Sequence, residues 1–398
     1  MLSYGFFLFT PLYGLNLKNG YTPSKANADF WVNGSIPWFR MEDIRTNGRI
    51  LSDAIQHITP KAVKGNLLPA YSLIMSTTAT IGEHALITVT SLTNQQITAF
   101  SLKENVIDNI DVKFMFYCFF DFGNWCKRNA NKSGGMHIIG IQKLKQYAIP
   151  IPPLPIQREI VRILDTFTEL TAELEAELEA ELEARKKQYE YYRESLLTFG
   201  DEVEWKTLGE VSRSITTGVT PLAKNSDYYN GDIPWLRTQE VRYIDIIDTE
   251  IKITQKALKE TSLKWVPKNS VIVAISGATA GRVGINKIPL TTNQHCCCLE
   301  VNKEKALYRY VFHCILNKNE DLLKLKQGAR GDLNTSLIKN FKIPIPPLAE
   351  QERIVAILDR FDALTHDISI GLPAEIAARK QQYEYYRDQL LTFKEVSP

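Results

Sequence analysis

Two stretches of the chain carry apolar residues at spacings of three and four over lengths typical of a long helix. The first apolar stripe runs from Ile160 to Leu182, and the second runs from Ile354 to Ile376. A Pro-Pro pair precedes each stripe, and such a pair does not fit a helix interior. The pattern predicts two helices of roughly 40 residues, about 60 Å long. So narrow a stripe favours pairing of the two as an antiparallel or crossed coiled coil.

The two stretches are copies of one another. Residues 149–199 and 343–393 both open IPIPPL, contain QxxIVxILDxF and close QYEYYRxxLLTF, without a gap at an offset of 194. The copies differ at Gly371-Leu372-Pro373, and a mid-helix proline predicts a bend or break near residue 372. At the corresponding place the first copy has a four-residue Glu-Ala-Glu-Leu period over 171–182, whose residues are good helix formers and predict a rigid spacer.

Short β-rich runs bounded by Gly and Asn, such as 86–89 and 270–275, precede each long helix and predict strands joined by polar loops. Short motifs recur among them: GYTP with GVTP at 20–23 and 218–221, IPW at 36–38 and 233–235, ATIG with ATAG at 79–82 and 278–281, and TNQ at 93–95 and 292–294. The sequences between the motifs differ strongly. A shared frame with dissimilar loops suits two binding units of different specificity.

We therefore predict an α+β chain with an internal tandem duplication and a pseudo-twofold relation between its halves. Two mixed, β-rich domains, residues 1–149 and 201–343, are separated by two long antiparallel coiled-coil helices, residues 150–200 and 344–398. Lys and Arg exceed Asp and Glu by five in each β-rich domain, whereas the two helical segments carry net charges of −5 and −3. This distribution favours phosphate contact by the domains, with ordinary surface variation as the alternative.

Composition and motifs argue against catalysis, a cofactor or a metal site. The six cysteines lack C-x-x-C spacing, and Cys296-Cys297-Cys298 alternate along a predicted strand, which favours core packing over metal binding. The chain has no NPPY, DPPY or GK[ST] motif. Asp245, Glu250 and Lys252 resemble the acidic residues and lysine of a nuclease site, but one such match is expected by chance in a sequence of this length. Without a signal-peptide pattern or a bilayer-length apolar run, we expect a cytoplasmic protein that does not contact a membrane.

The order of domain, long helix, domain, long helix, together with the paired IPIPPLxxQxxIVxILD and QYEYYRxxLLxF motifs, resembles the specificity subunit of a type I restriction–modification enzyme. The resemblance covers residues 20–393. Residues 5–14 depart from it, because they do not match the segment 203–210 that begins the second domain. A start site placed too early, a divergent first strand and a truncated domain are the three explanations left open.

The resemblance implies a non-catalytic subunit in which each target-recognition domain reads one half of a split, asymmetric double-stranded DNA sequence, while the helices fix the gap. It also implies two partner modification subunits, which bind S-adenosylmethionine and methylate adenine, and motor-nuclease restriction subunits that join them. Two other classes remain as alternatives: a coiled-coil scaffold holding two protein-binding units, and a bifunctional enzyme.

Readout of DNA bases requires Arg, Lys, Asn, Gln, Ser or Thr on loops or helix ends, and Arg and Lys also contact phosphate. For each candidate the competing interpretation is an ordinary surface residue, and Trp38 and Trp235 are more typical of core anchors than of base-stacking residues. The candidates are Lys25, Arg40, Thr77, Thr78, Lys132 and His137 in the first domain, and Lys224, Arg237, Ser276, Arg282 and Arg330 in the second.

An aromatic band lies near the end of each long helix. Part of this band is expected to pack between the helices, and the rest is a candidate platform for the modification subunits, since Tyr is enriched at interfaces. The candidate contacts are Tyr189, Tyr192, Tyr383 and Tyr386, with Tyr191 and Tyr385 in the same band.

Overall fold

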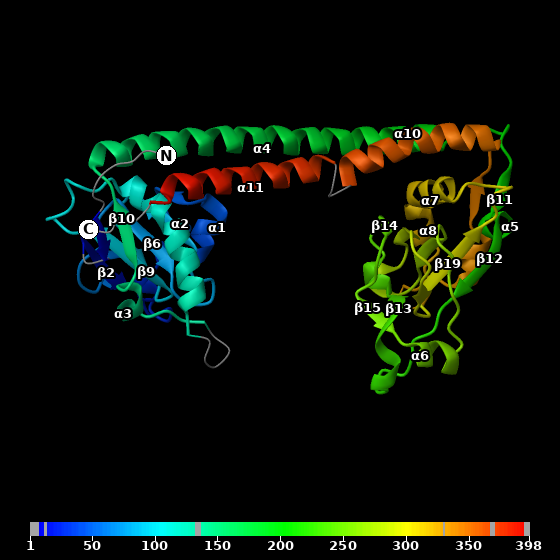
Figure 1. Ribbon diagram of the computed structural model, residues 1–398, viewed down its shortest axis with the longest axis horizontal. Coiled ribbons are helices and arrows are strands. Elements are labelled where there is room, and N and C mark those ends of the chain that lie inside the picture. The colour runs from blue at the N-terminus through cyan, green and yellow to red at the C-terminus, as the bar shows by residue number, and fades with distance from the viewer. Residues whose placement is uncertain (1–7, 12–13, 132–136, 329–330, 367–370, 394–398) are drawn as a thin grey trace. The chain divides into compact units, whose positions relative to one another are not determined.

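The computed structural model describes residues 8–11, 14–131, 137–328, 331–366 and 371–393, and the chain divides into two compact units (Figure 1). Unit 1 spans residues 1–174 and 378–398, and unit 2 spans residues 175–377. Each unit therefore combines one β-rich domain with parts of both long helical segments. We call the β-rich part of unit 1 the first domain and that of unit 2 the second domain.

The first domain contains two mixed sheets. The central strand β6 (Ser72–Ser76) is buried along its whole length, which explains why it shows no polar alternation. The five-stranded sheet has the order β2-β9-β6-β7-β4, and the three-stranded sheet has the order β5-β3-β8. Their other strands are β2 (Leu15–Asn19), β9 (Ile97–Leu102), β7 (His84–Ile87), β4 (Ile50–Leu51), β5 (His57–Ile58), β3 (Ile36–Phe39) and β8 (Leu92–Thr93).

The second domain has the same strand order in both sheets, β12-β19-β16-β17-β14 and β15-β13-β18. In each domain the last strand of the larger sheet is parallel to its neighbour, and the others are antiparallel. The predicted duplication is thus confirmed at the level of topology. These strands are β12 (Ser212–Thr217), β19 (Cys296–Val301), β16 (Val271–Ala274), β17 (Val283–Asn286), β14 (Asp245–Ile246), β15 (Ile251–Ile253), β13 (Tyr229–Leu236) and β18 (Thr291–Thr292).

One amphipathic helix covers the larger sheet in the first domain. It is α2 (Val112–Asn129), and its Phe114, Phe119 and Phe122 are buried with Phe100 of the sheet. In the second domain the corresponding path is divided into α7 (Tyr308–Asn317) and α8 (Asn319–Lys324). The shorter helices are α1 (Met41–Asn47), α3 (Ile141–Leu144), α5 (Leu208–Val211), α6 (Gln255–Glu260), α9 (Thr335–Asn340), η2 (Ala28–Phe30), η3 (Pro60–Ala62), η5 (Ser226–Tyr228), η6 (Thr238–Glu240) and η7 (Gly277–Thr279).

A two-stranded sheet precedes each long helix. In unit 1, β1 (Leu8–Pro11) pairs antiparallel with β10 (Ala148–Ile151). In unit 2, β11 (Trp205–Thr207) pairs antiparallel with β20 (Lys342–Pro344). Of the three explanations for the atypical start of the chain, a divergent first strand fits this pairing, because backbone hydrogen bonds do not require a matching sequence.

The first long helix, α4 (Leu154–Leu196), is continuous over 43 residues. The second long segment contains α10 (Leu348–His366) and α11 (Leu372–Leu391), so the predicted break near residue 372 is confirmed. Pro373 occupies the second position of α11, where the missing N–H removes no hydrogen bond within the helix.

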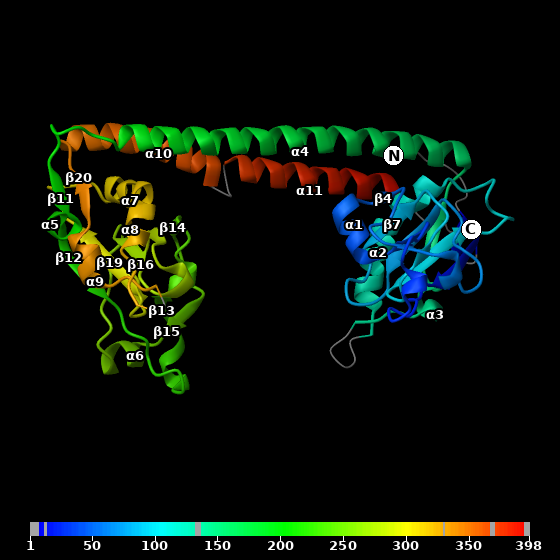
Figure 2. The same ribbon diagram turned by 180° about the vertical axis from the view of Figure 1, so that it is seen from behind.

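The long helices pack antiparallel within each unit, as predicted (Figures 1 and 2). In unit 1, Thr168 Oγ1 of α4 lies 2.8 Å from Tyr383 Oη of α11. The end of the second segment also reaches the first domain's core, where Leu390, Leu391 and Phe393 pack. In unit 2, Phe361 of α10 stacks against Tyr189 and Tyr192 of α4.

All six cysteines are buried and free. Cys296, Cys297 and Cys298 lie in β19 within the core, so their predicted packing role is confirmed. Within the described residues, no cluster of His, Cys, Asp or Glu has a geometry suited to a metal ion. No helix in that part of the chain has the length and apolarity needed to cross a membrane.

Candidate functional site

In the first domain the end of β3, the turn at 93–97 and the turn after β6 meet at one edge. Asn94 N donates to Phe39 O at 3.1 Å, and Thr77 N donates to Gln96 O at 2.9 Å. The loop after α2 joins them through Ala79 N, which donates to the carbonyl of His137 at 3.2 Å. We call residues 40, 77–80, 94–96 and 137 the first polar edge.

The same segments meet in the second domain. Asn293 N donates to Leu236 O at 3.0 Å, and Ile275 N donates to His295 O at 2.9 Å. Asp332 Oδ1 accepts from Ser276 Oγ at 3.0 Å and from the backbone N of residue 277 at 2.8 Å. Residues 237, 276–280, 293–295 and 332 form the second polar edge. The duplicated motifs thus converge in space, although they are far apart in sequence.

Arg40 is the first residue after β3, and its backbone is fixed by a buried carboxylate. Asp43 accepts from Arg40 N at 2.7 Å and from Ile55 N at 2.6 Å. The guanidinium of Arg40 is 2.8 Å from Glu42 and lies over the Trp38 ring at 5.8 Å. Trp38 is itself buried, and its indole N–H donates to Tyr21 O, so its role as a core anchor is confirmed.

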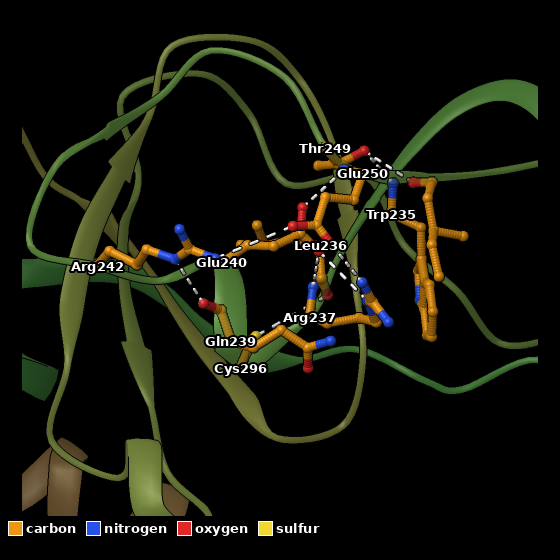
Figure 3. Close-up of polar contacts among 10 residues, drawn as sticks. Trp235, Leu236, Arg237, Gln239, Glu240, Arg242, Thr249, Glu250 and Cys296 are labelled. Carbon is orange, nitrogen blue, oxygen red and sulfur yellow. Dashed lines mark hydrogen bonds and ion pairs between the residues drawn. The ribbon is translucent and has the colours of Figure 1, made fainter. Parts of the chain in front are cut away.

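Arg237 has the equivalent position in the second domain, two residues after Trp235 as Arg40 is after Trp38, and Figure 3 shows its contacts. Glu240 accepts from Arg237 N at 3.3 Å and from Glu250 N at 2.7 Å, so it repeats the role of Asp43. The Arg237 side chain forms ion pairs with Glu250 at 2.7 Å and with Glu240 at 3.4 Å. Both arginines are partly exposed, and a phosphate that binds either one competes with carboxylates already in place. Trp235 is buried like Trp38, so it too is a core anchor.

The remaining candidates differ in their accessibility. Thr77 is buried, with its hydroxyl 3.1 Å from Thr98 Oγ1, so its side chain does not face solvent in this structure, and a DNA contact by Thr77 stays a prediction. The Oγ1 of Thr78 is buried without a hydrogen-bond partner. Arg282 is half-buried. Lys25, Lys224 and His137 are exposed, whereas Lys132 and Arg330 lie outside the described residues.

Gln95 and Gln294 are exposed polar-edge residues that the sequence-based list omits. The Thr22 hydroxyl donates to Gln95 Oε1, and the Thr220 hydroxyl donates to Gln294 Oε1. The recurring TNQ motif is the signal that identifies them, because a carboxamide is a suitable group for reading adenine. The nuclease-like set is not a site: Asp245, Glu250 and Lys252 belong to separate ion pairs, with Arg309, Arg237 and Asp248 respectively.

One aspartate in each long helix holds the adjacent domain. In unit 1, Asp165 binds Lys113 Nζ at 2.7 Å and accepts from Tyr117 Oη at 2.8 Å. In unit 2, Asp359 binds Arg309 at 2.7 Å, and its Oδ1 is 2.7 Å from His313 Nε2. Residues four apart share a helix face, so each domain helix presents a cation and a second polar group together. We call this arrangement the aspartate clamp.

Electrostatics favour the charged carboxylate in the second clamp. Burial acts to raise the pKa of Asp359, but hydrogen bonds from His313 and Arg309 outweigh it and hold that pKa below its usual value. Burial lowers the pKa of His313, which favours the neutral imidazole. The clamp in unit 2 thus rests mainly on the Arg309 charge.

The tyrosine band divides into inward and outward members. Tyr189 is only 2% exposed, and its hydroxyl lies 3.3 Å from His313 Nδ1, so its ring packs inward, and a partner contact by Tyr189 stays a prediction. Tyr383 is half-buried and bonds to Thr168. The outward members are Tyr191, Tyr192, Tyr385 and Tyr386, which are 67%, 37%, 60% and 45% exposed. Of these, Tyr192 also stacks against Phe361 and Tyr386 also contacts the ring of Phe167 of the facing helix, so Tyr191 and Tyr385 are the most open to solvent.

Comparison with known proteins decides the family. The model of the type I restriction modification DNA specificity domain matches the chain twice, over residues 15–184 and 200–378. The chain belongs to this family. It is therefore the DNA specificity subunit of a type I restriction–modification system, with two target-recognition domains. This subunit is not itself catalytic.

Two relatives from Escherichia coli are similar to this specificity subunit. The EcoprrI specificity subunit is 41% identical over 365 residues, which cover 89% of this chain and 87% of the relative. The EcoR124I/EcoR124II specificity subunit is 41% identical over 267 residues, which cover 64% of this chain and 65% of the relative.

Two solved structures share the fold of the specificity subunit. A chain from a study of complex assembly and conformational transition of the type I R-M system superposes with a TM-score of 0.67 at 15% identity, covering 95% of this chain and 98% of its own. The HsdS subunit from Thermoanaerobacter tengcongensis superposes with a TM-score of 0.52 at 15% identity, covering 95% and 96%. The predicted family and fold class are both confirmed.

Proposed function

We propose that this subunit selects the double-stranded DNA sequence on which its restriction–modification assembly acts, and that each domain reads one half of a split, asymmetric target through its polar edge. The observation that carries this proposal is the repetition of that edge. Arg40 and Arg237 occupy equivalent positions, as do Gln95 and Gln294, while the loops between the shared motifs differ in sequence. Equivalent scaffolds with different loops give two independent specificities.

The chemistry of the polar edges suits both kinds of DNA contact. A guanidinium binds phosphate or the major-groove edge of guanine, and a carboxamide pairs with the edge of adenine. The excess of five cations in residues 1–149 and again in 201–343 supports phosphate contact by both domains, whereas both helical segments are acidic. We take these two segments as the recognition domains, 150–200 as the spacer helix and 344–398 as the second helical segment.

The helices suit a role in spacing and assembly. The continuous helix α4 contains the tetrapeptide period, and its length fixes how many base pairs separate the two half-sites. We further propose that two modification subunits, which bind S-adenosylmethionine and methylate adenine, dock on the outward tyrosines of the helices, and that restriction subunits then join them in the cytoplasm. Exposed tyrosines suit such contacts because an apolar ring and a polar hydroxyl tolerate both solvent and an interface.

Domain exchange tests the proposal. Residues 16–149 are replaced by the matching segment of a relative with a different target, and the methylated sequence is determined by methylome sequencing of the host. The expected result is a change in one half-site with the other half and the spacer unchanged. A change in both halves would show that the domains do not read independently.

A binding assay separates this function from a coiled-coil scaffold for proteins. Electrophoretic mobility shift is measured on random duplex DNA, with and without the modification subunit. DNA binding that weakens steeply with salt is expected, because neutralised phosphates release counterions. Absence of binding under both conditions would favour the scaffold.

A further inference from the structure

The duplicated domains differ in how they fill one place, next to the strand that leads into each long helix. In the first domain this place holds a stack of three aromatic side chains. The ring centroids of Phe122 and Tyr147 are 4.8 Å apart at 27°, and those of Trp125 and Tyr147 are 5.3 Å apart. Lys143 Nζ lies 5.8 Å from the Trp125 ring and completes the cluster.

The second domain keeps only one of these three aromatics. Lys113 of α2 and Arg309 of α7 occupy the same place in the aspartate clamp, so each residue of α2 corresponds to the residue of α7 or α8 numbered 196 higher. The correspondence also holds further along these helices. Gly123 lies so close to Gly82 that an added Cβ would be 2.5 Å from Gly82 O, and its counterpart Asn319 donates to O of the corresponding glycine, Gly281, at 2.6 Å. Phe122 therefore corresponds to Lys318, and Trp125 corresponds to Asp321. Tyr147 corresponds to Phe341 at the offset of 194 between β10 and β20.

With two of the three aromatic side chains replaced, the second domain has a groove of about 430 Å³ at this place. Its apolar lining residues are Leu325, Leu337 and Phe341, and Lys318 and Lys342 are among its polar ones. Lys318 Nζ also lies 4.8 Å from the ring of Trp205, which is 42% exposed. In the part of the chain that the structure describes, neither lysine forms an ion pair with a carboxylate. Asp321, the acidic residue of the lining, is paired with Lys324 at 2.9 Å, and two lysines against one aspartate give the lining a net positive charge.

We propose that this groove is a docking site for a partner-protein segment that supplies an aromatic side chain flanked by carboxylates. The first domain indicates what fits an apolar hollow of this shape, since two aromatic rings of the chain itself fill the equivalent space there. The two unpaired ammonium groups specify the flanking charges, because acidic residues beside the aromatic side chain would lie against them. The site goes beyond sequence selection and does not depend on the polar edges, because no polar-edge residue lines it.

A peptide titration tests the site on the full chain. An acetylated peptide amide with the sequence DEWED is titrated by calorimetry, and one saturable site is expected. The peptide DEAED should bind at least about tenfold more weakly, since the buried ring carries most of the contact energy. Equal affinity for the two peptides would overturn the proposal.

Two matched variants locate the binding. Asp321→Trp places in the groove the indole that the first domain already has, and it should abolish DEWED binding. Lys324→Trp adds the same indole on the same helix outside the groove and breaks the same ion pair, so it should bind like the wild type.

A charge-reversed variant keeps the test decisive if Asp321→Trp does not fold. The double variant Lys318→Glu, Lys342→Glu should no longer bind DEWED and should instead bind the basic peptide KRWKR. Retention of DEWED by either groove variant in folded form would show that the peptide binds elsewhere. Loss of DEWED with Lys324→Trp would have the same consequence. Failure of the domain-exchange experiment would leave these results unaffected.

Discussion

Gln157 and Gln351, 194 residues apart, make corresponding hydrogen bonds in the two units, and both are fully buried. Gln157 accepts from Asp111 N at 2.9 Å and donates to Asn109 O and Pro152 O. Gln351 accepts from Leu307 N at 2.9 Å and donates to Lys305 O and Pro346 O. Each amide therefore joins the start of a long helix to the loop that precedes the domain helix.

Replacing either glutamine by glutamate should destabilise its unit by about 3 kcal/mol. A carboxylate cannot donate, so two buried carbonyls lose their partners and a charge is desolvated. Urea denaturation of Gln157→Glu and Gln351→Glu measures the loss. Gln382→Glu is the control, because Gln382 is exposed and accepts from Arg379 at 3.0 Å, a bond that a carboxylate keeps. Equal midpoints for all three variants would contradict the assigned role.

Buried His84 should make stability fall on acidification. Burial is the main cause that lowers its pKa to about 3, with a contribution from nearby Arg49. Between the ordinary pKa of 6.5 and about 3, the unfolded chain binds a proton that the folded chain does not, so stability falls with pH in that window. The slope is about 1.4 kcal/mol per pH unit for one such group.

The second domain supplies the matched variant for this histidine. Val283 is the counterpart of His84 and is also buried, in the equivalent strand β17. His84→Val should therefore remove this component of the pH dependence while His313 remains in both proteins. Urea midpoints measured from pH 7 to pH 4.5 test it. Parallel profiles for the wild type and the variant would refute the role of His84.

Tyr71 adopts a left-handed backbone conformation, with φ of 61°, in an exposed turn. Its counterpart Asn269 has φ of 67°, and Asn tolerates this region better than a bulky residue. Tyr71→Asn should therefore stabilise the chain by about 1 kcal/mol, and Asn269→Tyr should destabilise it by a similar amount. Thermal denaturation measures both shifts. The same sign of shift in both variants would rule out backbone strain as the cause.

The two kinds of polar-edge residue should affect DNA binding differently. Gln95→Ala should relax one position of one half-site at a cost of about 1–3 kcal/mol, because a base contact is lost. Arg40→Ala should weaken binding and, if the guanidinium meets phosphate, reduce the salt slope by about 0.9. Fluorescence anisotropy on matched and single-mismatch duplexes at several salt concentrations separates these outcomes. Unchanged affinity and preference in both variants would remove the first polar edge from the interface.

Deleting Glu175–Leu178 should shorten the gap between the half-sites and leave their sequences unchanged. Four residues span about 6 Å of helix and about 400° of rotation, so the apolar stripe stays nearly in phase. The change corresponds to one or two base pairs at roughly 3.4 Å each. Methylome sequencing reads the spacer directly, and deletion of Glu175 and Ala176 alone should instead disrupt helix pairing. An unaltered spacer in the four-residue deletion would show that α4 does not set the distance.

The long-range organisation was predictable from the sequence because repeats and helical periodicity are local signals. The Pro-Pro pairs, the 194-residue offset and the glycine-proline interruption indicate α4, the duplication and the break before α11. Burial of individual polar residues depends on the packing of distant segments. Thr77 follows a strand covered on both faces, so no alternation signalled that its hydroxyl meets Thr98. Tyr189 is buried because α7 brings His313 against it.

The polar edges were only partly predictable for the same reason. Arg40 and Arg237 were recognisable because they follow a repeated IPW motif. The recurring TNQ motif marks Gln95 as well, but its contact with Thr22, 73 residues away, could not be read from the sequence. The nuclease-like set illustrates the opposite error. Asp245 and Glu250 are close in sequence, yet each lies in a different ion-pair network.

The aspartate clamp also bears on how such a gene acquires new specificities. Lys113 with Tyr117 and Arg309 with His313 are different pairs, yet each satisfies the same aspartate of the duplicated helix. An incoming domain therefore needs to present one cation and a second hydrogen-bonding group one helical turn apart, whatever its recognition loops contain. A domain that presents such a pair can therefore replace the resident one without any change in the aspartate of the long helix.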